Sequence, residues 1–316
     1  MTYSLGGLIQ ATDYNNFAGG NGGGANVSGQ LNTVLGTGYG NAGYGQTSVS
    51  NVSVAGSVTA AQWSTLVGGV NKVRSHQTAF SNLGLYTTGT TINATTDVAT
   101  NLTDAYTSRL SYQSLGSVVT GSDFTLQITA PNQTTAASAS AERTATFTSG
   151  ADATRYFFNA GGELRFYIAS YTNTGGTVRG STLGGCAVNG LGGKTFKAVD
   201  NSARYGTGYT VTTDVTTGGG YYSLTTSYVE KIKISGSAYG AVYSGDYVSI
   251  DLKSDGTQGS NADKGTILTF RLNLYSAAQA SPAFNDSIDM TVTYRIDTAP
   301  PSTTYLSNSW GSVTIA

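Results

Sequence analysis

The chain has 316 residues, a formal net charge of −1, and 10% charged positions against 39% hydrophobic ones. Soluble monomers carry about 25% charged residues, so this composition suits a surface buried against neighbours, and it also occurs in fibres and secreted β-proteins. Nucleic-acid binding needs clustered Lys and Arg. The sixteen basic residues are scattered, so nucleic acid is not an expected partner. Cys186 is the single cysteine, which excludes an intrachain disulfide.

Residues 1–7 lack the basic region and the continuous apolar region of a secretory signal. No stretch reaches the roughly 18–20 apolar residues that span a bilayer. We therefore expect synthesis in a cytoplasm and no membrane insertion. Any external location would be reached without secretory export, for example by lysis of the cell.

The first 80 residues carry most of the helical pattern. A short helix is expected over residues 12–17, because Thr12 can cap it and Gly19 can end it. A second helix is expected over residues 27–35, where apolar side chains recur at helical spacing.

The clearest helix is expected from Thr59 to Gln77, where Thr59-Ala60-Ala61-Gln62 has the pattern of a capping box. Its apolar stripe consists of Trp63, Leu66, Val67, Val70 and Val73. The stripe packs either on its own domain or on a neighbouring subunit. Because the opposite face holds Gly, Asn and Ser, we assign an assembly interface to Trp63, Leu66 and Val70, together with Tyr14 and Phe17 of the first helix.

Between these helices, residues 35–46 are dense in glycine. A phosphate-binding dinucleotide fingerprint needs a preceding strand and a following helix. Here the glycines follow a helix and lead into alternating Ser and Val, so we predict an extended arm over residues 47–58. Residues 87–115 contain apolar side chains spaced for one more helix.

Beyond this region the pattern becomes that of strands separated by glycine-rich turns. Strands are expected at 123–129, 142–148, 164–169, 228–234, 247–252, 266–274 and 288–296, with a helical turn at 152–160. The sequence therefore predicts an α+β, mainly β chain, with a short-helix N-terminal region followed by an antiparallel β-sandwich or jelly roll. We place an anchoring region at 1–130, a polar linker at 131–140 and the β-sandwich at 141–316.

Groups that carry catalysis are scarce. His76 is the only histidine, and its place at the end of a predicted helix suits a cation that complements the helix dipole. Zinc sites combine several Cys and His residues at close spacing, and the chain has one of each, far apart. Paired carboxylates for glycan hydrolysis are also not indicated, because Glu occurs only at positions 142, 163 and 230. We predict no enzyme, catalytic residue, cofactor or metal site, and the acidic loop 251–263 leaves Ca²⁺ binding open.

The chain contains 21 tyrosines. Tyrosine has an apolar ring and a polar tip, which suits both subunit interfaces and stacking on sugars. Four of them fall near predicted loops and are candidates for contact with a glycan: Tyr221, Tyr222, Tyr239 and Tyr243. The alternative is that they fill strand faces and interfaces.

Three groups of segments carry a family resemblance. They are Ala11-Thr12-Asp13-Tyr14-Asn15; Gly43-Tyr44-Gly45-Gln46 with Thr59–Trp63 and Arg74-Ser75-His76-Gln77-Thr78; and Tyr156-Phe157-Phe158-Asn159-Ala160-Gly161-Gly162-Glu163-Leu164-Arg165-Phe166. Together they resemble a group of structural proteins of the tailed-bacteriophage virion. The resemblance implies a particle protein and supplies no active-site residues.

The residues and the resemblance together predict a tail, neck or baseplate attached, fibre-like virion protein that docks by its N-terminal region. Expected partners are other virion proteins and further copies of the chain, with a trimer as the expected cyclic homo-oligomer. Two alternatives stay open: an appendage module that binds a host receptor or surface glycan, and a head decoration protein. The sequence does not define the position on the particle, its symmetry or the docking partner.

Overall fold

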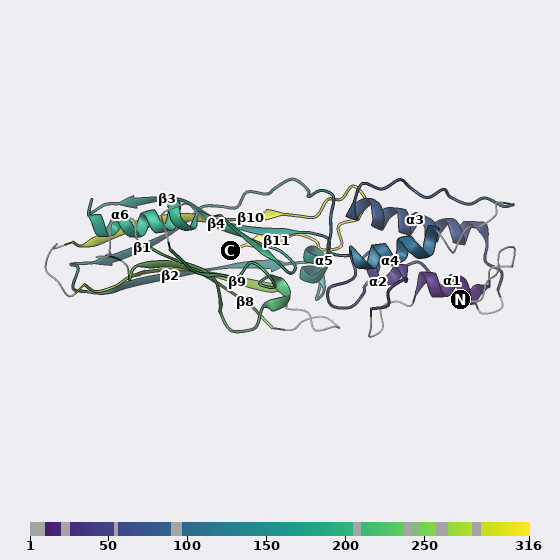
Figure 1. The fold of residues 1–316 in the computed structure, drawn as a ribbon, viewed down its shortest axis with the longest axis horizontal. Helices are drawn as coiled ribbons and strands as arrows, with labels where there is room; N and C mark the ends of the chain where they lie inside the picture. Colours follow the sequence, from purple (N-terminus) through teal and green to yellow (C-terminus); the bar gives the residue numbers. More distant parts are fainter. Residues whose placement is uncertain are drawn as a thin grey trace.

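The computed structural model describes residues 10–19, 26–53, 56–89, 97–204, 210–236, 243, 245–256, 265–279 and 286–316. Within these residues the protein is α+β and mainly β, as the sequence predicts. The molecule is elongated: helices α1 to α4 gather at one end, and two antiparallel sheets make up most of the remainder (Figure 1).

The helical region contains α1 (Ala11–Ala18), α2 (Leu31–Val34), α3 (Ala60–Gln77) and α4 (Ala99–Thr107). The predicted capping box begins α3: the Gln62 amide donates to the Thr59 hydroxyl over 3.2 Å, and the Thr59 amide donates to Gln62 Oε1 over 2.8 Å. The helix predicted over residues 27–35 is shorter than expected, because Gly29 has a left-handed φ of 84° that interrupts it. The predicted arm after the glycine-rich loop is extended in its described residues.

The two sheets form a sandwich. One has the strand order β1 (Phe124–Ala130), β10 (Ile288–Ala299), β3 (Glu163–Asn173), β4 (Gly193–Phe196) and β5 (Asn201–Arg204). The other has the order β11 (Val313–Ile315), β2 (Ala137–Phe147), β9 (Ile267–Ser276), β8 (Tyr247–Ser254), β7 (Val229–Ser235) and β6 (Thr210–Asp214). Burial alternates along β9 and β10 because one face of each strand points inward. Phe270 meets Phe166 and Phe196 across the interior, at ring-centroid distances of 6.2 and 5.1 Å.

Two further helices adjoin the sandwich. The first, α5 (Ala153–Asn159), lies where the sandwich meets the helical region (Figure 1). The second, α6 (Val178–Gly185), continues into a π-helical turn, Cys186–Leu191, and lies at the far end of the sandwich. A 3₁₀ turn, Tyr221–Ser223, precedes β7. The sequence predicts α5 but not α6, whose span contains three glycines.

The predicted division of the chain needs correction. Residues 124–130 form β1 and pair with β10, so they belong to the sandwich and not to the anchoring region. The predicted linker at 131–140 contains the start of β2, where alanines point inward and Ser138 and Ser140 are exposed. This part of β2 was predicted as a linker because its residues are small alanines and serines. In addition, the segment 300–312 returns from β10 to the helical region before β11 closes the sheet edge.

Candidate functional site

The five residues assigned to an assembly interface lie in the core of the chain itself. Tyr14 and Phe17 of α1 each pack against Trp63 of α3, with ring centroids 6.0 Å apart in both pairs. Leu66 and Val70 are equally buried within the described part of the chain. Because these side chains are at most 1% exposed, the interpretation in which the stripe packs on its own domain replaces the interface assignment.

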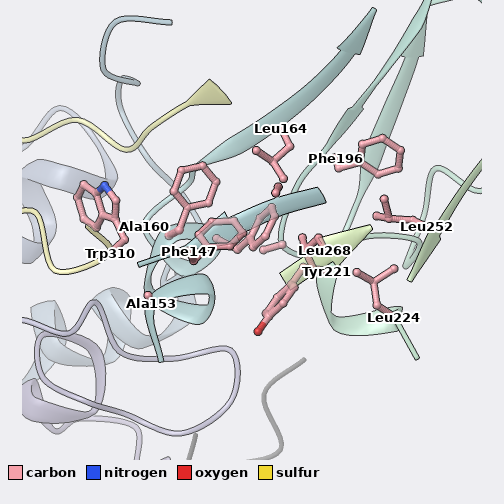
Figure 2. Packing of buried hydrophobic residues seen from close by; sticks show 14 of the residues in the cluster. Phe147, Ala153, Ala160, Leu164, Phe196, Tyr221, Leu224, Leu252, Leu268 and Trp310 are labelled. Carbon is pink, nitrogen blue, oxygen red and sulfur yellow. The ribbon is translucent and has the colours of Figure 1, made fainter. Parts of the chain in front are cut away.

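Three of the tyrosines assigned to glycan contact lie in the described residues, and their side chains pack or bond within the chain. Tyr221 stacks on Phe158 with ring centroids 4.8 Å apart, and Figure 2 shows it within the buried cluster. Tyr222 Oη lies 2.7 Å from Asn159 Oδ1, and Tyr243, which is buried, donates to Asp286 Oδ2 over 2.6 Å. Tyr239 lies outside the described residues. Tyr221 and Tyr243 are therefore buried, and Tyr222 is half-buried with its hydroxyl bonded within the chain, so none of the three is free for contact with a glycan.

Three of the segments that carry the sequence resemblance, Gly43–Gln46, Arg74–Thr78 and Tyr156–Phe166, meet at the junction between the helical region and the sandwich. The other two, Ala11–Asn15 and Thr59–Trp63, meet within the helical region, where Tyr14 packs on Trp63. The junction is built on the glycine-rich loop 36–46 and on α5. Asn159 Nδ2 lies 3.1–3.2 Å from the carbonyl oxygens of Gly40, Ala42 and Gly43. Arg155 Nη1 donates to the Ala42 carbonyl over 2.7 Å. Two buried side chains of α5 thus hold the backbone of a loop that lies more than 110 positions earlier.

Tyr44 anchors the same loop to two other parts of the chain. Its hydroxyl donates to the Arg109 carbonyl over 2.8 Å and accepts from Gln77 Nε2 over 3.0 Å. The C-terminal segment closes the other side, where Gln46 forms a pair of hydrogen bonds with the Ser307 backbone, of 2.9 and 2.7 Å. Elements from the start, middle and end of the sequence are therefore joined here.

His76, expected to act as a cation at a helix end, is buried in this junction. Its Nε2 donates to the Ala160 carbonyl over 3.0 Å, and its ring lies edge-on to Tyr44 at 5.2 Å. Burial lowers the pKa of His76 to about 4. The imidazole is therefore neutral at pH 7, and its role is to join α3 to the residue that follows α5.

The glycines of this loop have a steric role and not the phosphate-binding role excluded above. Gly43 and Gly45 have left-handed φ values of 93° and 65°. A Cβ on Gly43 would collide with the Thr37 carbonyl, and a Cβ on Gly45 would collide with the Tyr156 ring. In the motifs that meet here, the glycines allow the backbone conformation of the loop, and the polar side chains hold that conformation in place.

A groove of about 500 Å³ lies on the helical region, between α3 and residues 47–51. Tyr14, Leu35, Gln62 and Lys72 contribute to its lining, together with Gly68. A Cβ added to Gly68 would meet no heavy atom within 4 Å, so this helix position opens to the groove.

A second feature lies on the outer face of the six-stranded sheet. The strand registers place three rows of side chains across β2, β9, β8 and β7. The rows are Ser138, Tyr275, Tyr247, Ser235; Ser140, Asn273, Ser249, Lys233; and Glu142, Arg271, Asp251, Glu230. A depression of about 370 Å³ lies among the residues of these rows.

A comparison of the chain with protein-family models, curated proteins and solved structures finds no match. Among the described residues, no group of three or more His, Cys, Asp or Glu side chains could hold a metal ion. No helix in the described ranges is long and apolar enough to cross a membrane. Residues 257–264 of the acidic loop lie outside the described residues, and Asp255 before them accepts from the Thr266 amide over 2.9 Å.

Sequence reasoning missed two lysines buried inside the sandwich. Lys194 of β4 pairs with Asp214 of β6, with 2.5 Å between Nζ and Oδ1. Lys231 of β7 donates to Ser223 Oγ over 2.9 Å, and burial together with the nearby Lys194 charge lowers its pKa to about 8. A buried amine of this kind is chemically capable of proton transfer, but its 1% exposure leaves no access for a substrate. Only the unusual position of Lys231 beside the apolar residues of a strand could have drawn attention to it.

Proposed function

We propose that the chain is a structural component of a tailed-phage virion, attached at the tail, neck or baseplate. In this proposal the N-terminal helical region docks on the particle and the β-sandwich projects from it. The observation that carries the proposal is the junction at residues 36–46, where three of the segments of the family resemblance meet. It joins the two ends of an elongated molecule through buried and partly buried hydrogen bonds (Figure 1). A fixed distance between two ends is what a particle attachment needs.

The distribution of charge supports docking through the helical end. Of sixteen basic and seventeen acidic residues, six lie in the first 122 positions: Asp13, Lys72, Arg74, Asp97, Asp104 and Arg109. Burying a charge at an interface is unfavourable unless it is paired. A region with so few charges can be covered by a neighbouring protein with little desolvation penalty.

The position on the particle is tested by electron microscopy of particles assembled with the full chain carrying a gold-labelled C-terminal tag. We expect label at the tail, neck or baseplate. Label on the capsid faces would favour a head decoration protein instead, and particles without label would refute the proposal. Sedimentation velocity of the purified chain tests the expected homotrimer.

The groove at Gly68 is the part of the helical region where we expect a virion neighbour to dock. Gly68→Leu fills the groove from a helix position with no close neighbour, so folding is preserved. Particles made with this variant should lose most of the chain. The matched control is Gly84→Leu, because Gly84 is exposed and equally free of neighbours but lies outside the groove. If both variants are incorporated equally, the groove is not the docking site. The position of the chain on the particle is still tested separately by the gold label.

A further inference from the structure

The outer face of the six-stranded sheet contains a slot beside an aromatic ring. Tyr275 of β9 stacks on Tyr247 of β8, with ring centroids 4.9 Å apart and planes inclined by 24°. Lys233 of β7 places its ammonium 3.9 Å from the centroid of the Tyr247 ring. Because β7 and β9 lie on opposite sides of β8, the lysine covers the Tyr247 face that is turned away from Tyr275.

The remaining face of Tyr275 is turned toward β2. Its cross-strand neighbour there is Ser138, which is exposed, and Ser140 follows on the same side of the strand. Small side chains beside a large ring leave space, and the depression of about 370 Å³ is lined by these residues. This volume is at the lower end of the range of about 300–1,000 Å³ for small-molecule sites.

Polar groups along one side of the slot are held in place before any ligand arrives. Asn273 Nδ2 donates to Asp251 Oδ2 over 2.9 Å and to Ser249 Oγ over 3.0 Å. Arg271 Nε donates to the same Asp251 oxygen over 3.1 Å, and the Arg271 guanidinium lies 3.8 Å from the Tyr228 ring centroid. The amide and the guanidinium are thus fixed in orientation, which lowers the entropy lost when a ligand binds them.

The charges of this face limit the class of ligand. The three rows contain two cations, Arg271 and Lys233, and three carboxylates, Glu142, Asp251 and Glu230. Each cation lies within 4.0 Å of an acid, Arg271 of Asp251 and Lys233 of Glu230. A polyanion would meet the carboxylates, so phosphate-rich ligands are disfavoured. A neutral ligand with an apolar face and a rim of hydroxyl groups matches the stacked ring and the fixed donors and acceptors.

We propose that this face binds a neutral hexose oligosaccharide, with one sugar ring stacked on Tyr275 over the β2 serines. Hydroxyl groups at the rim of the sugar would bond with Asn273, Arg271 and the serine hydroxyls. The inference is independent of the proposed function, since a chain found outside any particle could still bind the sugar. A chain located on the particle could equally fail to bind it.

Titration of the full chain with maltohexaose, cellohexaose and mannohexaose, followed by calorimetry and saturation-transfer NMR, tests this inference. Heparin serves as the polyanionic comparison. We expect at least one neutral oligosaccharide to bind, and Tyr275→Ala to weaken that binding at least tenfold. The matched control is Tyr305→Ala, because Tyr305 is 39% exposed and lies in the C-terminal segment, and this variant should bind as the parent does.

A second variant separates lost binding from lost folding. Ser138→Trp fills the slot from an exposed position on the strand, so it should abolish binding while the circular dichroism spectrum and melting temperature stay unchanged. Three outcomes would overturn the proposal: no binding to any of the neutral oligosaccharides, binding unaffected by both Tyr275→Ala and Ser138→Trp, or binding of heparin alone.

Discussion

The helical region and the β-sandwich hold extended backbone in different ways. In the sandwich, strands pair with strands in continuous ladders. In the helical region, asparagine side chains take the place of a neighbouring strand. Asn32 of α2 donates to the Val49 carbonyl and accepts from the Val49 amide, both over 2.8 Å. Asn15 of α1 pairs with Val52 in the same way, and Asn71 of α3 pairs with Leu83.

The difference shows how a segment that has no neighbouring strand can be ordered. A carboxamide offers one donor and one acceptor side by side, so a single asparagine satisfies both polar groups of one residue in an extended segment. Each of the three helices therefore fixes a neighbouring segment that would otherwise lack backbone partners. The sandwich instead carries its polar interactions as ion pairs, such as that between Arg271 and Asp251 on its outer face.

Removing an asparagine clamp should have the largest effect. Asn32→Leu keeps the volume but leaves the Val49 amide and carbonyl unpaired, along with the Gly19 carbonyl, to which Asn32 also donates over 3.1 Å. With about 1–3 kcal/mol for each unsatisfied buried group, we expect a loss of about 4 kcal/mol in the free energy of unfolding. Urea denaturation measures it.

Asn101→Leu is the control for this comparison. Asn101 is a half-buried residue of α4 whose Nδ2 donates to the carbonyl of Asp97, two residues before the helix begins. Its loss should change stability by less than about 1 kcal/mol, as expected for a surface substitution. Similar losses for Asn32→Leu and Asn101→Leu would show that the clamp does not stabilise the region.

Periodicity in the sequence was sufficient to predict most strands of the sandwich, but it could not predict the contacts of the junction. Strands such as β9 and β10 alternate over most of their length, and their predicted ranges differ from the observed ones by a few residues. The sequence missed β4, β5 and β6 because they are only four or five residues long and are rich in polar side chains. The contacts of Asn159 with Gly40 and of Gln46 with Ser307 join distant positions. No local pattern identifies such partners.

Acid should weaken the junction through His76. Its pKa is about 4 in the folded chain and about 6.5 when unfolded, so below pH 6.5 the unfolded state binds a proton that the folded state does not. Stability is therefore lost as the pH falls from 6.5 to 4, by about 3 kcal/mol at about 1.4 kcal/mol per pKa unit. Urea denaturation at pH 7 and pH 4.5 measures this loss.

The control is His76→Gln, which can still donate to the Ala160 carbonyl but does not titrate. Asp246 acts in the opposite direction, because burial raises its pKa to about 6 and its protonation at lower pH stabilises the fold. Asp246 contributes equally to the parent and to the variant, so the difference between their losses of stability at low pH measures the contribution of His76 alone. Equal acid sensitivity of the parent and His76→Gln would contradict the assignment.

A smaller effect, of opposite sign, is expected inside the sandwich. The pKa of Lys231 is lowered from 10.5 to about 8, so below pH 8 the fold must hold a buried ammonium. The destabilisation is present at pH 7 and disappears as the pH rises through 8 toward 10.5. Lys231→Met removes it, and we expect a gain of about 2 kcal/mol at pH 7, since replacing buried charge with apolar groups often stabilises.

Thermal unfolding at pH 7 and pH 10 measures this gain, which should shrink at the higher pH. Lys72→Met is the control, because Lys72 is exposed on α3 and its loss should change little. A loss of stability at pH 7 in Lys231→Met would mean that the bond from Lys231 to Ser223 contributes more than the buried charge removes.

The smallest predicted effect separates two adjacent glycines of α3. Alanine in place of a mid-helix glycine stabilises by about 1 kcal/mol when the site is free, and a Cβ on Gly68 meets nothing within 4 Å. Gly68→Ala should therefore raise the midpoint of urea denaturation. A Cβ on Gly69 would lie 2.6 Å from Leu31 Cδ2 and 3.3 Å from Leu35 Cδ2, so Gly69→Ala should lower the midpoint because the fully buried Leu31 side chain must shift within the packed core.

Opposite signs at these neighbouring positions would show that α3 uses one glycine to let α2 approach and leaves the other facing an open groove. A higher midpoint of urea denaturation for both variants would contradict the close packing of α2 on α3. A loss at both would mean that the groove beside Gly68 is already filled by the chain itself, which would also remove it as a place where a neighbouring protein can dock.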